Sequence, residues 1–182
     1  ASQPQNEKGW RARSGFLARH GRWQVAAADL ARLLEIHPED PEVWHQLAAL
    51  LVASGQLDAY RAHCRKSLER FGKSNEPSTA ERIAKDCLIL PDSGVDLGVV
   101  SQMADTAAAV TNHWATPWFQ FVKGLSEYRQ GRFAKAVEWM NKVLTGVNTF
   151  ILIVSSFTMV LALDSIQRGN QAKLKGYLFA TI

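Results

Sequence analysis

The side chains of this sequence best suited to metal binding or nucleophilic chemistry are five histidines and two cysteines. None of the histidines pairs one helical turn away with another histidine, a cysteine or a carboxylate in a recognised metal-ligand spacing. His63 is followed directly by Cys64, and adjacent side chains on a helix point about 100° apart, so the two cannot chelate one ion from one face. Cys64 and Cys87 form no CxxC motif and fall at apolar helix positions, where a thiol acts as a small hydrophobe. The pattern therefore predicts no metal site and no bound cofactor.

The sequence also lacks the short motifs that usually carry catalysis. It contains no GxSxG nucleophile turn, no Walker-type glycine loop and no HExxH zinc motif. Glu81, Arg82 and Asp86 share one predicted helix, where a salt-bridged surface is a better interpretation than a general acid/base pair. We therefore predict that the chain is not an enzyme.

Basic residues do not gather into a nucleic-acid-binding pattern. The net charge of +4 is spread over both halves of the chain, and an isoelectric point near 9.2 is weak evidence by itself. One predicted helix carries a basic series interrupted by Glu69: Arg61, Arg65, Lys66, Arg70 and Lys73. No aromatic residue interleaves the series for base stacking, so we interpret it as the solvated face of an outer helix; a patch for an acidic partner is the alternative.

Residues 146–163 form an uncharged stretch that raises the question of a membrane span. A spanning helix needs about 20 predominantly apolar residues. This stretch contains Asn148, Thr149, Ser155, Ser156 and Thr158. We therefore interpret it as a buried helix of a folded domain and predict no membrane partner.

Internal repetition is the strongest signal in the sequence. Trp10 and Trp44 are separated by the same interval as Gly21 and Gly55. In each unit the tryptophan lies on a helix with apolar residues at helical spacing, the glycine permits a turn, and a second apolar helix follows. Pro38 would end the first helix pair, because a proline interrupts a helix. The pattern predicts consecutive helix–turn–helix units.

The repeats continue toward the C-terminus with less regular spacing. Gly131 follows Gly55 by slightly more than two repeat intervals, so the third unit carries a short insertion between predicted helices at 80–90 and 97–110. Gly169, slightly more than one interval after Gly131, predicts the turn of a fifth unit with helices at 151–163 and 172–179. We expect a single array over residues 1–182 with units at about 7–40, 41–74, 76–112, 117–148 and 150–182, the last incomplete.

These spacings and residue types resemble the tetratricopeptide repeat (TPR) family, whose unit is about 34 residues long. The resemblance implies an all-α fold, a TPR-type α-solenoid of about four and a half units that wind into a right-handed superhelix. It implies a protein that binds other proteins.

A closer resemblance covers residues of about 20–145. The chain is similar there to the TPR regions at the C-terminal end of planctomycete-type bacterial serine/threonine kinases and WD40-repeat proteins. Four segments carry the likeness: 21–29, 60–72, 80–88 and 123–133. The resemblance implies an accessory part of a bacterial signalling protein, with no kinase motif in this chain.

In TPR arrays the first helix of each unit lines a concave groove. On the family register this implies eight groove residues that would contact a protein or peptide ligand: Arg11, Arg19, His45, Gln46, Arg82, Trp118, Phe121 and Arg129. Arginine would pair with carboxylates of the ligand and the aromatic rings would anchor it. For each position, a solvated or packing role stays the alternative.

We therefore expect a non-catalytic scaffold that binds a protein or peptide in its concave groove. The alternative is a self-association module, in which the apolar last unit forms a homo-oligomer. The sequence begins without a methionine or a signal peptide, so we expect an excised segment of a longer protein. Two cysteines without a disulfide framework favour a cytoplasmic location.

Overall fold

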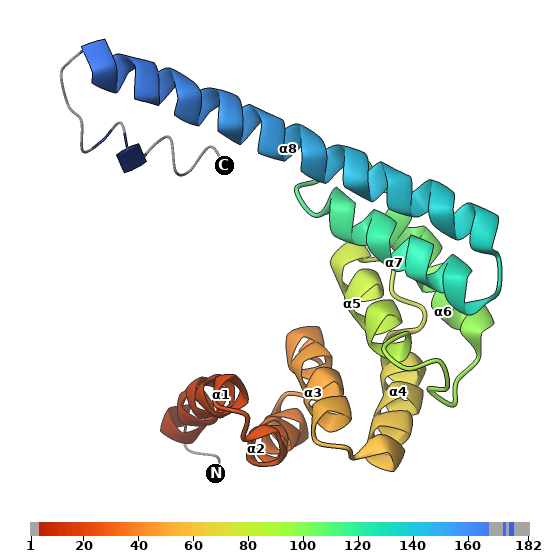
Figure 1. Cartoon of the computed structure of the whole chain (residues 1–182). Coiled ribbons are helices and arrows are strands. Elements are labelled where there is room, and N and C mark those ends of the chain that lie inside the picture. The colour runs from red at the N-terminus through yellow and green to blue at the C-terminus, as the bar shows by residue number, and fades with distance from the viewer. Residues whose placement is uncertain (1–3, 168–172, 174, 177–182) are drawn as a thin grey trace. The chain divides into compact units, whose positions relative to one another are not determined.

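The computed structural model describes residues 4–167, 173, 175 and 176. Within this part of the chain it contains eight helices and no strand. They are α1 (Pro4–Arg19), α2 (Trp23–Ile36), α3 (Pro41–Ala53), α4 (Leu57–Phe71), α5 (Pro77–Cys87), α6 (Leu97–Ala108), α7 (Thr116–Arg129) and α8 (Phe133–Gln167) (Figure 1). The all-α repeat fold predicted from the sequence is confirmed. The chain divides into two compact units, residues 1–139 and 140–182.

The predicted turn glycines end the first helix of three helix pairs. Gly21, Gly55 and Gly131 have φ angles of 72°, 74° and 73°, a left-handed conformation that glycine adopts without the steric penalty of a Cβ atom. The amide of the residue after each glycine donates back into the preceding helix, as from Arg22 to the carbonyl of Leu17 at 2.9 Å. The same local chemistry therefore produces the same turn in each of these units.

Capping residues followed by proline begin the first helices of the second and third pairs. Asp40 accepts a hydrogen bond from the amide of Glu42, and Pro41 occupies the first helical turn. Glu76 accepts from the amides of Ser78 and Thr79, with Pro77 in the first turn. This cap places the start of α5 at Pro77 and its end at Cys87, slightly earlier at both ends than the expected 80–90.

The C-terminal helix differs from the prediction. We expected a break near residues 148–150 and a new helix at 151, but α8 runs without interruption over 35 residues. The physical reason is that no proline follows Pro117 in the sequence, whereas prolines stand at the ends of the earlier helix pairs. Gly146 alone does not end the helix. The predicted turn at Gly169 lies outside the described residues.

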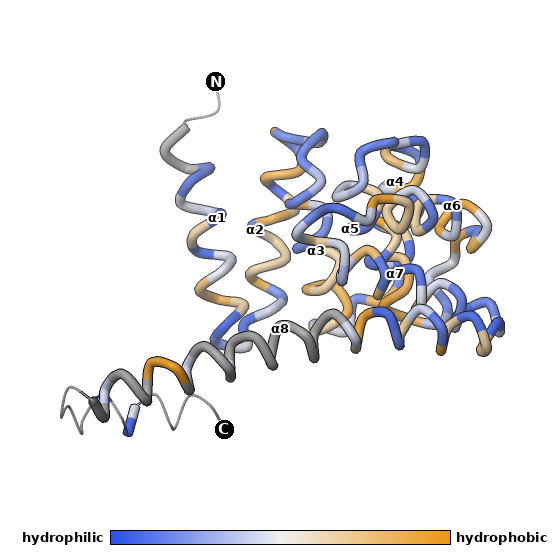
Figure 2. Tube along the Cα trace, turned by 90° about the horizontal axis from the view of Figure 1, so that it is seen from above, coloured by the Kyte–Doolittle hydropathy of each residue, from blue (hydrophilic) through white to orange (hydrophobic). Residues whose placement is uncertain are grey.

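The core of residues 1–139 forms where each helix packs against its neighbours along the chain. Helix α2 packs against α1 and α3, α3 against α4 and α5, and α7 against α5 and α6. Tyr60, Ile83 and Phe119 are fully buried, and apolar and polar segments alternate along the helices (Figure 2). Cys64 and Cys87 are also fully buried, as the sequence predicted.

Among the residues that the structure describes, no helix is long and apolar enough to cross a bilayer.

Candidate peptide-binding surface

Helices α3 and α5 bring three of the predicted groove residues together through two acidic partners. Arg82 Nη2 lies 3.1 Å from Glu42 Oε2, and Gln46 Nε2 donates to the other oxygen of Glu42 at 2.9 Å. One turn away, His45 Nδ1 lies 2.6 Å from Asp86 Oδ1. The structure thus places His45, Gln46 and Arg82 in two neighbouring sets of polar contacts across α3 and α5, which we call the polar cluster.

Asp86 anchors this cluster from inside the core. Its side chain is about 2% exposed, and its second oxygen, Oδ2, has no hydrogen-bond partner among the described residues. Burial raises the pKa of the Asp86 carboxyl to about 7, although the bond from His45 works in the opposite direction. The Tyr60 hydroxyl donates to the backbone carbonyl of Asp86 at 2.7 Å, which fixes the end of α5. The buried carboxyl therefore orients the half-buried imidazole of His45.

This burial corrects one interpretation from the sequence. Glu81 and Asp86 were expected on a salt-bridged surface, but they are 6% and 1% exposed. Of the three, only Arg82 keeps substantial exposure, and its ion pair is with α3. The packing of α5 against α3, α4, α6 and α7 turns most of this short helix inward.

A second group of side chains lies between α5 and α7. Lys85 Nζ is 2.5 Å from Glu81 Oε1 and 5.9 Å from the centre of the Trp118 ring. A small cavity of about 200 Å³ opens here. Its lining consists of Ser78, Glu81, Arg82, Lys85, Trp114, Ala115, Trp118 and Phe119. Two predicted groove residues, Arg82 and Trp118, therefore share a site with residues that the sequence analysis did not select.

The other four predicted groove residues either lie apart from this site or make contacts that stabilise the fold. Arg11 pairs with Asp40, the capping residue of α3, at 2.7 Å. Arg19 is exposed at the end of α1, and Phe121 is half-buried on α7. Arg129 donates to the carbonyls of Leu88 and Ile89 at 3.0–3.2 Å, so it caps the end of α5.

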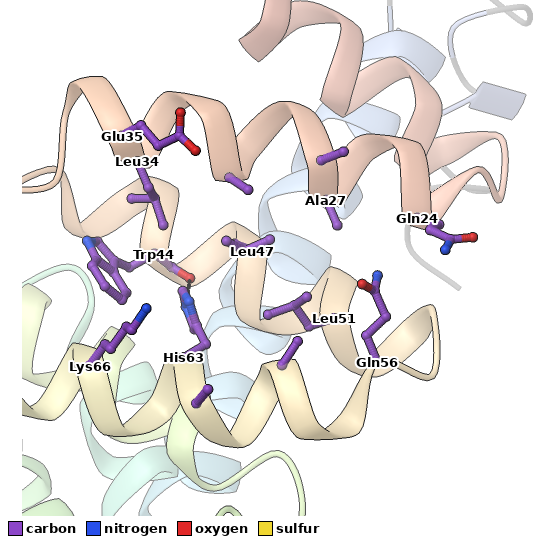
Figure 3. A pocket seen from close by; sticks show the side chains of 14 residues that line it. Gln24, Ala27, Leu34, Glu35, Trp44, Leu47, Leu51, Gln56, His63 and Lys66 are labelled. Atoms are coloured by element: carbon purple, nitrogen blue, oxygen red, sulfur yellow. Dashed lines mark hydrogen bonds between the residues drawn. The ribbon is translucent and has the colours of Figure 1, made fainter.

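A larger hollow lies elsewhere, between the second helices α2 and α4 with α3 as its floor. It encloses about 700 Å³. Figure 3 shows Trp44, Leu47 and Leu51 on the floor, with Glu35 and Lys66 toward one end and Gln24 and Gln56 toward the other. Small residues leave it open: Ala27, Ala28, Ala31, Ala59 and Ala62. The alanines are visible in the sequence, but they are equally typical of closely packed helices, so the pattern could not predict the groove.

No group of three or more histidine, cysteine or carboxylate side chains in the described part of the chain is arranged to hold a metal ion. The polar cluster of α3 and α5 and the site between α5 and α7 offer hydrogen-bond donors, ion pairs and aromatic faces. Groups of these kinds are common in sites that bind a ligand.

Comparisons with known proteins agree with this architecture. A family model for the tetratricopeptide repeat matches residues 7–50. Curated protein sequences give no significant match. Among solved structures, MamA from Desulfovibrio magneticus RS-1 is similar, with a TM-score of 0.57, 16% sequence identity, and 99% of this chain and 95% of that chain covered. A thermophilic TPR protein of Thermus thermophilus gives a TM-score of 0.56 at 16% identity, covering 96% of this chain and 89% of that chain.

The eight described helices and these structural neighbours define an α-solenoid built of helix–turn–helix units. The match of the tetratricopeptide-repeat model covers residues 7–50, and the structural neighbours share the fold of the chain.

Proposed function

We propose that the chain is a non-catalytic scaffold that binds a protein or peptide on the face formed by α3, α5 and α7. The single observation that carries the proposal is the position of Arg82, Gln46 and His45 on neighbouring helices: Arg82 and Gln46 share Glu42, and His45 is held by the buried Asp86. A ligand-binding face needs polar groups in fixed positions, because a fixed donor loses less entropy on binding than a mobile one.

The chemistry of the cluster suits an extended polypeptide. Arg82 uses one N–H group on Glu42 and keeps other donors for a ligand, and its side chain is 35% exposed. His45 is 28% exposed, so its imidazole reaches the surface while Asp86 holds Nδ1. Trp118, which is 57% exposed, adds an aromatic face beside Lys85. Together, Arg82 and His45 offer polar contacts and Trp118 offers an apolar ring face.

Site-specific photo-crosslinking tests which face is used. A photoreactive amino acid is placed at Gln46, within the cluster, or at Ala31, in the groove between α2 and α4. Each purified chain is exposed to lysate of its source organism and irradiated. We expect the same partner to be cross-linked repeatedly at position 46 and not at position 31. Cross-linking at position 31 alone would show that the partner binds in the groove between α2 and α4, and the proposed face would be wrong.

Arg82→Ala provides the matching affinity prediction. Once that partner is purified, the substitution is expected to weaken its binding about ten-fold, because a contact to a charged donor is worth about 1.5–3 kcal/mol. Ala31→Arg, a change in the other groove, is the control and should leave the affinity unchanged. Isothermal titration calorimetry measures both. Equal affinities for the wild type and Arg82→Ala would remove Arg82 from the binding site.

Self-association is a second candidate, favoured by exposed apolar residues on α8. Leu144 and Val160 are 57% and 61% exposed, and contact with a second copy would remove this surface from water. We expect the oligomer fraction in multi-angle light scattering to fall for Leu144→Glu and Val160→Glu. A wild-type chain that stays monomeric over the micromolar range would exclude this candidate.

The sequence resemblance to the TPR regions of bacterial kinases and WD40-repeat proteins supports a proposal on the larger protein and its location. We propose an accessory, substrate- or partner-recruiting part of a larger bacterial signalling protein in the cytoplasm, without a nucleic-acid partner. Expression of the full-length protein followed by fractionation and partner identification tests this setting.

A further inference from the structure

Two tryptophans beside α5 are more exposed than their size predicts. Trp114 is 82% exposed and Trp118 is 57% exposed, and both line the cavity of about 200 Å³ between α5 and α7. Aromatic surface that stays in water adds nothing to the stability of the fold, and it remains available for burial against a partner. The site is too small for a large ligand and has room for one or two side chains of a chain that passes over it.

The loop that carries Trp114 is held in place by its own contacts. The amide of His113 donates to Thr116 Oγ1 at 3.2 Å, and that hydroxyl donates back to the carbonyl of His113 at 2.7 Å. The His113 ring stacks on the buried Phe119 with 5.4 Å between ring centres. Trp114 is therefore displayed from an ordered turn, which lowers the entropy lost on binding.

The unpaired polar groups of the site are mainly donors. Neither the Trp114 nor the Trp118 indole N–H has a hydrogen-bond partner among the described residues, in contrast to Trp44, whose N–H bonds the carbonyl of Pro38 at 2.8 Å. Lys85 and Arg82 retain further N–H groups, while the carboxylates nearest to them, Glu81 and Glu42, already accept from these two cations. A matching ligand brings carbonyl acceptors and few N–H donors of its own.

Proline-rich segments have this composition. Proline has no backbone N–H, its carbonyl neighbours accept hydrogen bonds, and its ring packs flat against an indole. In the polyproline II conformation the segment is already extended, so binding orders it at little entropic expense. A strongly acidic peptide fits less well, because both cations of the site are already paired.

We infer that Trp114 and Trp118 form a docking site for a proline-rich segment of a partner protein in the polyproline II conformation. The inference deepens the proposed function and rests on it, since the site lies at the α5–α7 end of the same face. Prolines pack against the two indole rings, and the indole N–H groups and Lys85 donate to the carbonyls of the segment.

Fluorescence anisotropy with a labelled polyproline peptide tests the inference on the whole chain. The matched probe is a peptide of equal length in which every second proline is replaced by alanine. We expect saturable binding of polyproline and at least about five-fold weaker binding of the matched probe. Trp114→Ala and Trp118→Ala should each weaken polyproline binding about ten-fold, the size expected for an aromatic anchor.

Two further variants distinguish the effect of the indole N–H group from that of the aromatic ring, and the effect of this site from that of an exposed ring elsewhere. Trp114→Phe keeps an aromatic face and loses the N–H donor, so we expect a loss smaller than that of Trp114→Ala. Phe16→Ala removes a ring on α1 whose exposure of 53% is close to the 57% of Trp118, and it should leave polyproline binding unchanged. Circular dichroism confirms that each variant is folded, as the exposure of Trp114 leads us to expect.

The inference is overturned if polyproline shows no saturable binding, if both peptides bind alike, or if Trp114→Ala and Trp118→Ala bind as the wild type does. Partner cross-linking at position 46 together with any of these results would leave the scaffold function standing without the proline site. Polyproline binding that depends on both tryptophans, without cross-linking at position 46, would support the proline site and reject the wider face.

Discussion

Asp86→Asn is expected to stabilise the folded protein at pH 8 by about 2 kcal/mol and to flatten its pH dependence between about pH 4 and pH 7. Asp86 is 1% exposed and its Oδ2 has no partner among the described residues. Burial raises its pKa from an ordinary 3.8 to about 7. An asparagine keeps the shape and still accepts a hydrogen bond from His45, but it never has to carry a buried charge.

The direction of the pH effect follows from proton binding. Between about pH 4 and pH 7 the folded protein retains the Asp86 proton and the unfolded chain releases it. The contribution of Asp86 to stability is therefore complete below the unfolded pKa and is lost as the pH rises through the folded pKa. The neighbouring groups that modulate this titration are His45 on α3 and Lys85 on α5, which lower the pKa of Asp86, and Glu81 on α5, which raises it.

Urea unfolding at pH 5 and pH 8 measures the difference. The control is Asp58→Asn, because the Asp58 side chain is fully exposed and its pair with Arg61 is a surface contact. We expect the control to change stability by less than about 0.5 kcal/mol at both pH values. If Asp86→Asn is less stable than the wild type at pH 8, the His45–Asp86 contact is a stabilising ion pair and the burial argument is wrong.

Glu127→Ala is expected to destabilise the protein by about 3 kcal/mol. The Glu127 side chain is 4% exposed and pairs with Lys123 at 2.7 Å and with Arg132 beyond the turn of Gly131. Lys123 is itself buried, and its other partner is Asp105 on α6 at 2.6 Å. Removing the carboxylate leaves a buried ammonium group with a single, exposed partner, so an uncompensated charge remains inside the α6–α7 contact.

The contribution of Glu127 to folding stability is expected to depend on pH in the direction opposite to that of Asp86. The hydrogen bond from Arg132, and then that from Lys123, lowers the pKa of Glu127 from 4.5 to about 2. Its stabilising effect is present above about pH 4.5 and is lost as the pH falls toward 2. Glu127→Gln should therefore differ most from the wild type near neutral pH and approach it in acid.

Thermal and urea unfolding of the variants test this prediction. Glu69→Ala removes an exposed glutamate of α4 and serves as the control, with an expected change below about 0.5 kcal/mol. A Glu127→Ala protein as stable as the control would mean that solvent replaces the carboxylate and that the ion pairs contribute little.

Several features of the candidate site could not be predicted from the sequence. Arg82, His45 and Gln46 were selected from the family register, and the structure brings them together. Trp114, Lys85 and the buried Asp86 were not selected, because their importance depends on contacts with other helices. His45 and Asp86 are far apart in the sequence, and no local pattern specifies that they meet. Glu81 was misplaced on the surface for the same reason.

Local signals in the sequence were sufficient to predict the helices, their order and most of their turns. Glycine at a left-handed turn, proline at a helix start and apolar residues at helical spacing act on their immediate neighbours, so their effects can be predicted locally. The uninterrupted α8 was missed, although the lack of prolines after Pro117 was visible.

Packing between the helices settles which polar side chains are buried, which of them pair, and where the surface is hollow. The alanines of α2 and α4 could have closed their helices together, but they leave a groove of about 700 Å³. The physical reason is that burial, pKa and cavity volume depend on the distances and angles between helices, which arise from packing over the whole core and not from any single segment.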